Sequence, residues 1–366
     1  MFEKGIISIR QFTILVALYT VGTAILIIPS ILAANAKQDV WLAGLIGLGI
    51  GLLLVLLNWS LSKRFHFINF AEIIEKVFGP VLGRIFSLIF FLSYVFILAV
   101  FVLRNIGDFM TTVMMVETPI EAIHLLFLII VLYGVRLGLE TFTRTTELFL
   151  PWLVILFVVL FFTLLPKMQI INLLPILENG MKPVLRSSVS LIVFPFLELI
   201  LFLMIIPNVN QPEKTRGAYL LGTFLGGGIL ILISTLSILV MGVNETSRSI
   251  YPTFDLSKTI NIREFFQRVE AFMALIWFIT VYVKLIVLTY ILCVGISHSL
   301  RIHDYKLLTF PIGLLMFVVS LVIFPSSSYL IEFTPIYDVY AIIWLFFFPL
   351  IIWVVSLIRG KPAAPH

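Results

Sequence analysis

Residues 187–207 read SSVSLIVFPFLELILFLMIIP, and this stretch decides the fold because it is long enough to cross a bilayer yet contains a helix breaker and an acid. At about 1.5 Å per residue it spans the roughly 30 Å of bilayer hydrocarbon. Pro195 lacks an N–H and clashes with the preceding turn, so the helix is expected to open between Phe194 and Glu198. Open backbone at this depth is tolerated only where protein or a water-filled cavity receives it.

Glu198 is a second reason to expect a site in this stretch. A carboxyl group inside the bilayer costs a few kcal/mol unless it is neutralised or paired, so it indicates function. Lys284 raises the same question in a later apolar run, where Thr280 lies on the same helix face. Packing offers an alternative for both, with Glu198 bonded to a neighbour in a kinked helix and Lys284 in a buried pair that fixes helix register. The sequence leaves open whether the two side chains pair with each other.

The composition of the whole chain indicates its class. The 366 residues are 61% hydrophobic and 12% charged, with a mean hydropathy of +1.16, which predicts a polytopic membrane protein. The single cysteine, Cys293, and five scattered histidines form no metal-binding pattern, and no nucleophile–base pair stands at a recognisable spacing. Neither a cofactor nor an enzyme is therefore expected. The net charge of +5 does not indicate nucleic acid, because the basic residues lie in short loops.

Apolar runs predict ten membrane-spanning helices. They are Ile14–Ala34, Val40–Leu61, Leu82–Leu103, Ala122–Val135, Phe149–Leu165, Ser187–Pro207, Ala218–Val243, Ala271–Ile296, Leu307–Phe324 and Ala341–Ile358. The segments on the side of the termini hold fourteen Lys and Arg residues against seven on the other side, which predicts that both termini are cytoplasmic. Between the second and third spans, Phe67–Phe78 is amphipathic and predicts a helix on the cytoplasmic leaflet or under the bundle.

The first span carries an interruption of its own at Val21-Gly22-Thr23-Ala24. Gly22 lowers the helix preference, and the hydroxyls of Thr20 and Thr23 can bond carbonyls that an opened turn releases. A packing contact is the alternative reading of this glycine. The place of the interruption in the chain favours a functional role, because the Ile-Ile-Pro motif that follows it occurs again after the break in the sixth span.

This repeat divides the chain into two halves. Ile27-Ile28-Pro29 recurs as Ile205-Ile206-Pro207, an offset of 178 residues, and the same offset carries Gly44 onto Gly222. Each half has five spans, and because five is odd the second half enters the membrane from the opposite side. The sequence therefore predicts one transmembrane domain over residues 1–366 that is an inverted repeat, with halves at about 8–166 and 186–358. In transporter folds, an inverted repeat with two interrupted leading helices points to a binding site near the bilayer midplane.

We expect the two interruptions to face each other and to form a pocket for a small ligand. Tyr94, about halfway along the third span, and Thr280 are expected to complete its walls. The ligand's polar groups would meet freed backbone groups and the half-helix dipoles. The predicted ligand-binding residues are Thr20, Val21, Gly22, Thr23, Tyr94, Phe194, Pro195, Phe196, Glu198, Thr280 and Lys284.

Several motifs, taken in order, resemble the B-subunits of spore germinant receptors, the GerAB type. They are Gly22 with Pro29, the loop from Asn172 to Gly180, Phe194-Pro195-Phe196 with Glu198, Tyr251-Pro252, and Arg268 with Glu270 before Trp277. The resemblance spans essentially the full chain. In one departure, the first break reads Gly22-Thr23-Ala24 where related permeases often carry two glycines.

The resemblance implies a fold, a function and partners. That family looks like a branch of the amino acid–polyamine–organocation superfamily, so an all-α integral membrane protein with a LeuT-like 5+5 inverted repeat is expected. It implies a nutrient-sensing subunit in the spore inner membrane, assembled with an A-subunit and a lipoprotein C-subunit, that binds a germinant such as an amino acid or a sugar-type co-germinant. A proton- or sodium-coupled amino acid transporter remains the alternative, because both would use the same site.

Overall fold

The computed structural model describes residues 5–260, 270–324 and 327–358, and the structural statements below concern these residues. They are helical nearly throughout, and their one β-bridge joins Ile7 to Val209. Of the motif residues named above, Arg268 lies outside the described residues.

The α-helices follow the expected order. They are α1 (Ile9–Val21), α2 (Ala24–Ala36), α3 (Val40–Arg64), α4 (Phe70–Phe78), α5 (Leu82–Phe90), α6 (Phe96–Phe109), α7 (Ile120–Leu137), α8 (Leu139–Leu164), α9 (Met181–Leu191), α10 (Thr215–Arg248), α11 (Pro252–Lys258), α12 (Glu270–Leu300), α13 (Lys306–Val322), α14 (Ser327–Ile342) and α15 (Phe348–Ile358). Short π-helical turns join α5 to α6 and α14 to α15, and a 3-10 helix, Leu197–Met204, continues the span that α9 begins.

Within the described chain, these helices combine into the ten expected spans. α1 and α2 are the halves of the first span, α9 and Leu197–Met204 those of the sixth, and α5–α6 and α14–α15 each form one span. Eight stretches of the described chain are long and apolar enough to cross a membrane, and Ile9–Val21 and Lys306–Val322 are shorter apolar helices, which agrees with the prediction of ten spans. The tenth span differs most, because α14 begins at Ser327 rather than near Ala341.

Both predicted interruptions are present, and each has a local cause. Gly22 ends α1 with φ +20° and ψ −124°, a backbone conformation that side chains with a Cβ rarely adopt. In the sixth span Phe194, directly before Pro195, leaves the helical region with φ −130° and ψ 107°. This is the extended conformation that a following proline imposes. The first and sixth helices are therefore discontinuous, as the sequence predicts.

Two short helices occupy corresponding places in the two halves. α4 joins the second and third spans, and α11 joins the seventh and eighth. α4 is capped by the Asn69 side chain, which accepts a hydrogen bond from the Glu72 N–H, and it buries Phe70, Ile73 and Ile74 completely. It therefore lies under the bundle rather than free on a lipid surface.

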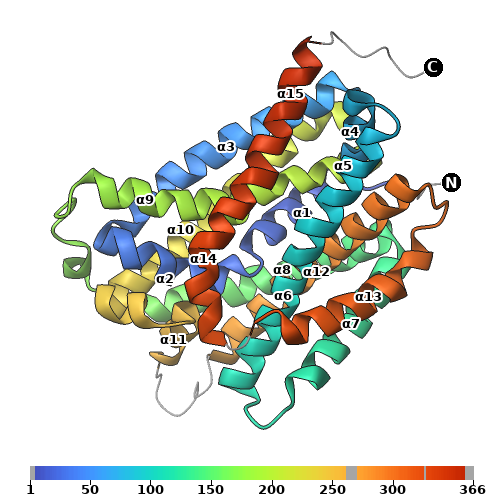
Figure 1. Cartoon of the computed structure of the whole chain (residues 1–366). Helices are drawn as coiled ribbons and strands as arrows, with labels where there is room; N and C mark the ends of the chain where they lie inside the picture. Colours follow the sequence, from blue (N-terminus) through green and yellow to red (C-terminus); the bar gives the residue numbers. More distant parts are fainter. Residues whose placement is uncertain (1–4, 261–269, 325–326, 359–366) are drawn as a thin grey trace.

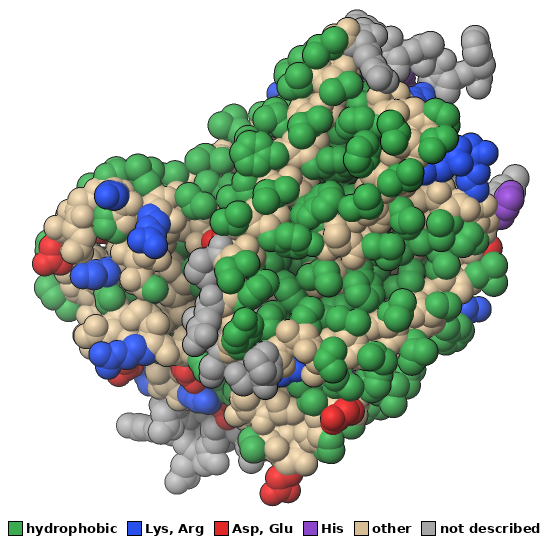
Figure 2. All heavy atoms as spheres, viewed as in Figure 1, with side chains coloured by type: hydrophobic (Ala, Val, Ile, Leu, Met, Phe, Trp, Pro, Cys, Tyr) green, Lys and Arg blue, Asp and Glu red, His purple; other side chains and the backbone are tan. Residues whose placement is uncertain are grey.

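The chain has a terminal side, where α1 begins and α15 ends, and an opposite side, where α9 begins and α11 lies (Figure 1). On the terminal side the end of α3 meets the end of α15, since Arg64 Nη2 donates to the Ser356 carbonyl at 2.7 Å. Figure 2 shows hydrophobic side chains over α13, α14 and α15, with charged side chains gathered toward the edges of the view. This distribution fits a protein embedded in a bilayer.

Glycine stripes on α10 and α3 let other helices approach closely. A Cβ on Gly222 would lie 2.7 Å from Val16 Cβ, and one on Gly226 would lie 2.6 Å from Thr20 Cβ, so α10 packs tightly on α1. On α3, Gly47 and Gly51 face Leu191 and Phe196 in the same way. The small residues therefore hold the intact spans against the broken ones.

The contact between α10 and α1 can be tested with one methyl group. We expect Gly226→Ala to lower the melting temperature of the detergent-purified protein, because the added Cβ must displace Thr20 or the Ala17 carbonyl, an overpacking that costs about 1–3 kcal/mol. Gly228→Ala, two residues along the same helix, is the matched control because nothing lies within 4 Å of its Cβ. Equal melting temperatures for the two variants would show that the glycine contact does not stabilise the fold.

Candidate ligand-binding site

A buried ion pair joins two helices of the second half of the protein, the sixth span and α12. Glu198 follows the break in the sixth span, and its Oε2 lies 2.8 Å from Nζ of Lys284 in α12. Both side chains are completely inaccessible to solvent. A charge removed from water this completely requires its partner, so the position of each helix depends on the other.

Aromatic side chains surround the pair and supply its remaining contacts. Tyr19 donates a hydrogen bond to Glu198 Oε2 at 3.2 Å, and Tyr337 donates to Oε1 at 3.4 Å. The Lys284 ammonium lies 4.3 Å from the ring centroid of Phe194 and 5.0 Å from that of Tyr19. Among the described residues, Lys284 Nζ has no acceptor other than Glu198. The rings therefore take the place of further acceptors for this cation.

Gly22 provides the space through which Lys284 reaches the pair. A Cβ at Gly22 would lie 2.7 Å from Lys284 Cδ and 2.8 Å from the Tyr19 carbonyl oxygen. The Gly22 carbonyl, released by the break, accepts a hydrogen bond from the Thr280 hydroxyl at 3.3 Å. The first break therefore packs against α12 through two contacts, with the Lys284 stem and with the Thr280 hydroxyl.

The π-helical turn Phe91–Val95 brings the third span into the same network. Tyr94, within this turn, is fully buried, and its hydroxyl lies 3.1 Å from that of Tyr337. The Tyr340 hydroxyl donates to the Ser93 carbonyl. Because π-helical turns in α-helices frequently mark functional sites, their presence in the third and tenth spans supports a site at this level.

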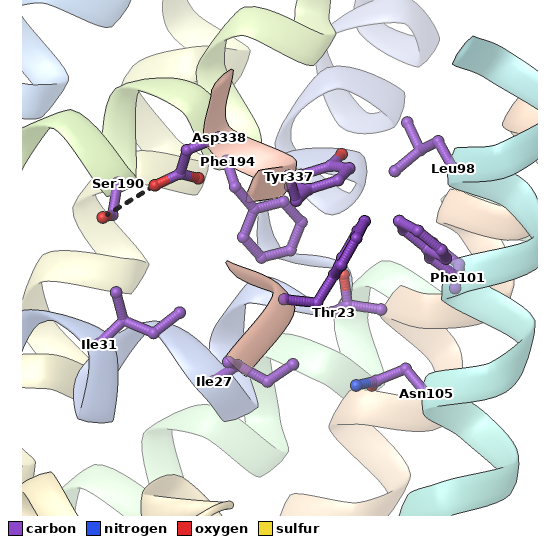
Figure 3. Close-up of a pocket in the computed structure, with 12 residues that line it drawn as sticks. Thr23, Ile27, Ile31, Leu98, Phe101, Asn105, Ser190, Phe194, Tyr337 and Asp338 are labelled. Carbon is purple, nitrogen blue, oxygen red and sulfur yellow. Dashed lines mark hydrogen bonds between the residues drawn. The ribbon is translucent and has the colours of Figure 1, made fainter. Parts of the chain in front are cut away.

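A cavity of about 100 Å³ lies beside the pair, between α2, α6, α9 and α14 (Figure 3). Its lining residues are Thr23, Ile27, Ile31, Leu98, Phe101, Val102, Asn105, Ser190, Phe194, Phe333, Tyr337 and Asp338. Phe194 and Tyr337 are shared by the cavity wall and the ion-pair network, so they separate the cavity from Glu198. A ligand in the cavity would therefore touch the side chains that hold the pair.

The structure distributes the sequence-predicted site residues over three places. Thr23 and Phe194 line the cavity. The ion-pair network beside the cavity contains Gly22, Tyr94, Glu198, Thr280 and Lys284. Thr20 instead packs on Gly226, and Phe196 packs between Gly51 and Gly227, so both face neighbouring helices. Val21 and Pro195 are buried but do not line the cavity.

Sequence reasoning missed the contribution of the tenth span. Tyr337 and Asp338 line the cavity, but the predicted span began after them, at Ala341. A signal was present, since Phe333, Tyr337 and Tyr340 follow one another at spacings of four and three residues, which places them on one helix face. An aromatic stripe of this kind, next to an acid and continuous with an apolar run, predicts a longer helix facing a polar site.

Hydrogen bonds close both ends of the two broken spans. On the opposite side, the Leu177 N–H donates to the Asp39 carboxylate at 3.0 Å, so the chain entering the sixth span is bound to the chain leaving the first. On the terminal side, the Ile7 N–H donates to the Asn208 carbonyl at 2.9 Å, which binds the chain entering the first span to the chain leaving the sixth. We call these contacts the two latches.

The described part of the site lacks a cluster of metal ligands. Among the described residues, no group of three or more His, Cys, Asp and Glu side chains lies in an arrangement that could hold a metal ion. Cys293 is buried in α12. The ionised groups of the network are one carboxylate and one ammonium that neutralise each other.

Comparison with known proteins gives consistent results for family and fold. Residues 6–328 match the family model described as spore germination protein. The chain is 29% identical to spore germination protein KB of Bacillus subtilis (strain 168) over 98% of this chain and 96% of that protein. It is 24% identical to spore germination protein A2 of the same organism, over 95% and 94% of the two chains.

Two solved structures share the fold. One is Mhp1, a nucleobase-cation-symport-1 family transporter with bromovinylhydantoin bound, at a TM-score of 0.67 and 13% identity, covering 93% of this chain and 75% of that one. The other is MhsT in complex with L-phenylalanine, at a TM-score of 0.63 and 14% identity, covering 87% and 80%. At this identity the likeness shows the fold alone, and it confirms the LeuT-like arrangement of ten helices.

A double-mutant cycle tests the buried pair. We expect Glu198→Ala to lower the free energy of unfolding by about 3–5 kcal/mol, because it leaves the Lys284 ammonium buried without a counter-charge. Adding Lys284→Met should recover most of the loss, since the stranded charge is then gone. The measurement is thermal or denaturant unfolding of the purified variants in detergent.

The control for this cycle is Glu140→Ala, which breaks the exposed pair between Glu140 and Arg144. Pairs of this kind contribute about 0–1 kcal/mol, so little change is expected. A double variant as unstable as Glu198→Ala alone would show that Glu198 acts through packing rather than through its charge.

Proposed function

The chain belongs to the spore germination protein family, and on that premise we propose that it is the germinant-binding subunit of a spore germination receptor. It binds a small nutrient, an amino acid or a similar compound, in the cavity between α2, α6, α9 and α14, and it signals by changing shape. A binding role rather than a catalytic one is supported by the description of the family as spore germination protein and by the transporter that shares its fold.

The observation that carries the proposal is the shared wall between the cavity and the buried ion pair. Tyr337 lines the cavity and donates to Glu198, and Phe194 lines the cavity and lies over the Lys284 ammonium. A ligand that moves either ring changes the environment of a charge pair that has no access to water. Because the pair joins the sixth span to α12, ligand occupancy is coupled to the relative position of the two helices.

A ligand shifts such an equilibrium only if it binds one arrangement better than the other. The latches define the arrangement described here, in which both ends of the broken spans are closed. Ligand contacts on Thr23 and Phe194, directly beside the two breaks, would favour an arrangement with a different angle between the half-helices. The proposed signal is therefore a hinge movement at Gly22 and Phe194, transmitted to the surface through α2 and α9.

The proposed setting follows from the family and from the charge distribution. The chain is an integral membrane protein, and fourteen basic residues against seven support cytoplasmic termini. We place it in the spore inner membrane with an A-subunit and a lipoprotein C-subunit as partners. A proton- or sodium-coupled amino acid transporter is the alternative function, and it would use the same cavity.

Filling the cavity tests the proposed function. We expect Ile31→Phe to abolish the germination response, or to raise the nutrient concentration needed for it at least tenfold, because the larger ring occupies the space of the ligand. Leu53→Phe, which enlarges an exposed apolar side chain on α3, is the matched control and should respond normally. The measurement is germination rate against nutrient concentration, with subunit abundance checked by immunoblot. A normal response in spores that carry Ile31→Phe would place the ligand elsewhere.

A further inference from the structure

The charge of the cavity lining restricts what the cavity can bind. Among its twelve lining residues Asp338 alone carries a formal charge, and the described lining includes no Lys, Arg or His. The two buried cations of nearby helices are already engaged. Lys284 pairs with Glu198, and Arg104 pairs with Asp108 at 3.0 Å and also donates to backbone carbonyls of α13. The cavity therefore presents a net negative charge in apolar surroundings.

Asp338 lies on one side of the cavity and has no cationic partner among the described residues. It is half-buried on α14, and within the described residues it accepts a hydrogen bond from the Ser190 hydroxyl at the long distance of 3.5 Å. A carboxylate in an apolar setting is strongly stabilised by a counter-charge, because little water is present to screen it. Figure 3 shows this side chain beside Ser190, at the edge of the cavity that α9 and α14 form.

Asn105 supplies a second and independent indication of a ligand. Its side chain is 4% exposed, and its Oδ1 has no hydrogen-bond partner among the described residues. Figure 3 shows the amide directed from α6 toward the cavity, on the side away from Asp338. Buried polar atoms are nearly always satisfied, so an acceptor left without a donor at a cavity wall indicates that something outside the protein supplies the donor.

We propose that the cavity selects its ligand by a protonated amine. Asp338 receives the ammonium group, Asn105 accepts a further N–H or O–H donor of the ligand, and Ile27, Ile31 and Phe101 contact its apolar part. The ligand class is a small organic ammonium compound, and the inference rests on the proposed function because it specifies the ligand of the same site. A ligand with a carboxylate but no amine would be repelled by the negative charge of Asp338. A neutral sugar would leave that charge without a counter-charge, so both are expected to bind weakly.

Three isosteric probes test the inference on the purified full-length chain in detergent at constant ionic strength. They are isobutylammonium, isobutanol and isobutyrate, which share one apolar group and differ in the polar end. Binding is measured as the rise in melting temperature with probe concentration, since a ligand of the folded state stabilises it. We expect isobutylammonium to bind at least tenfold more tightly than either isostere. Ammonium chloride alone, which separates an organic from an inorganic cation site, should give no comparable rise.

Two variants assign the selectivity to residues. Asp338→Asn should weaken isobutylammonium binding about tenfold or more, since a charge-assisted hydrogen bond becomes a neutral one, and should leave isobutanol binding unchanged. Asn105→Asp keeps the shape of the side chain and adds a negative charge, so it should tighten isobutylammonium binding, a gain that misfolding cannot produce. Asp304→Asn, in a loop outside the cavity, is the control for loss of one acid and should bind like the parent chain.

Several results would overturn the inference. They are unchanged isobutylammonium binding in Asp338→Asn, equal affinity for isobutanol, an equal effect of ammonium chloride, or no binding of isobutylammonium by the parent chain. These results are separable from failure of the proposed function. If Ile31→Phe abolishes germination while Asp338→Asn germinates normally, the cavity is the ligand site and only the selection by an amine is wrong.

Discussion

The structure depends on the burial of one ion pair. Glu198 and Lys284 lie 2.8 Å apart with no access to water, so each charge must keep its partner within reach. Two local features of the sequence make this possible. Gly22 leaves room for the lysine stem where the first span breaks, and the extended backbone at Phe194 turns the sixth span so that Glu198 faces inward. The breaks and the pair therefore form one unit, in which a change at any member alters the others.

The rest of the fold holds this unit in place while leaving it able to move. Glycines on α3 and α10 pack the intact spans directly against the broken ones, which fixes their depth and rotation. The latches are weaker. They consist of a few hydrogen bonds near the ends of the spans, each worth about 0.5–1.5 kcal/mol net. A protein with a rigid scaffold and lightly held half-helices is suited to two arrangements of similar free energy, between which a small ligand can choose.

Much of this was predictable from the sequence, because breakers and buried charges in apolar runs are local signals. Pro195 and Gly22 predicted both interruptions, and the repeat of Ile-Ile-Pro predicted the two halves. The pairing of Glu198 with Lys284 required the rotation of two helices, which residue spacing alone does not give. Phe196 was assigned to the pocket because it flanks the break, but the backbone turn at Phe194 directs it toward Gly51 and Gly227. Asp338 was missed because the polar residues of α14 lower the local hydropathy, so the apolar run that predicted the span begins only after them, at Ala341.

We infer that the chain binds its ligand in the cavity and does not pass it on to the terminal side. The cavity lies between the breaks and the opposite side, while the ion pair and the latch at Ile7 and Asn208 lie between the breaks and the terminal side. Transport would require the ion pair and this latch to open in each cycle, so that the ligand could reach the terminal side. The most direct measurement is binding and uptake of radiolabelled amino acids by the chain alone in liposomes, with proton and sodium gradients imposed. We expect saturable retention that approaches one ligand per protein, without accumulation in the lumen. Gradient-driven accumulation that continues over many ligands per protein would contradict it and establish a transporter.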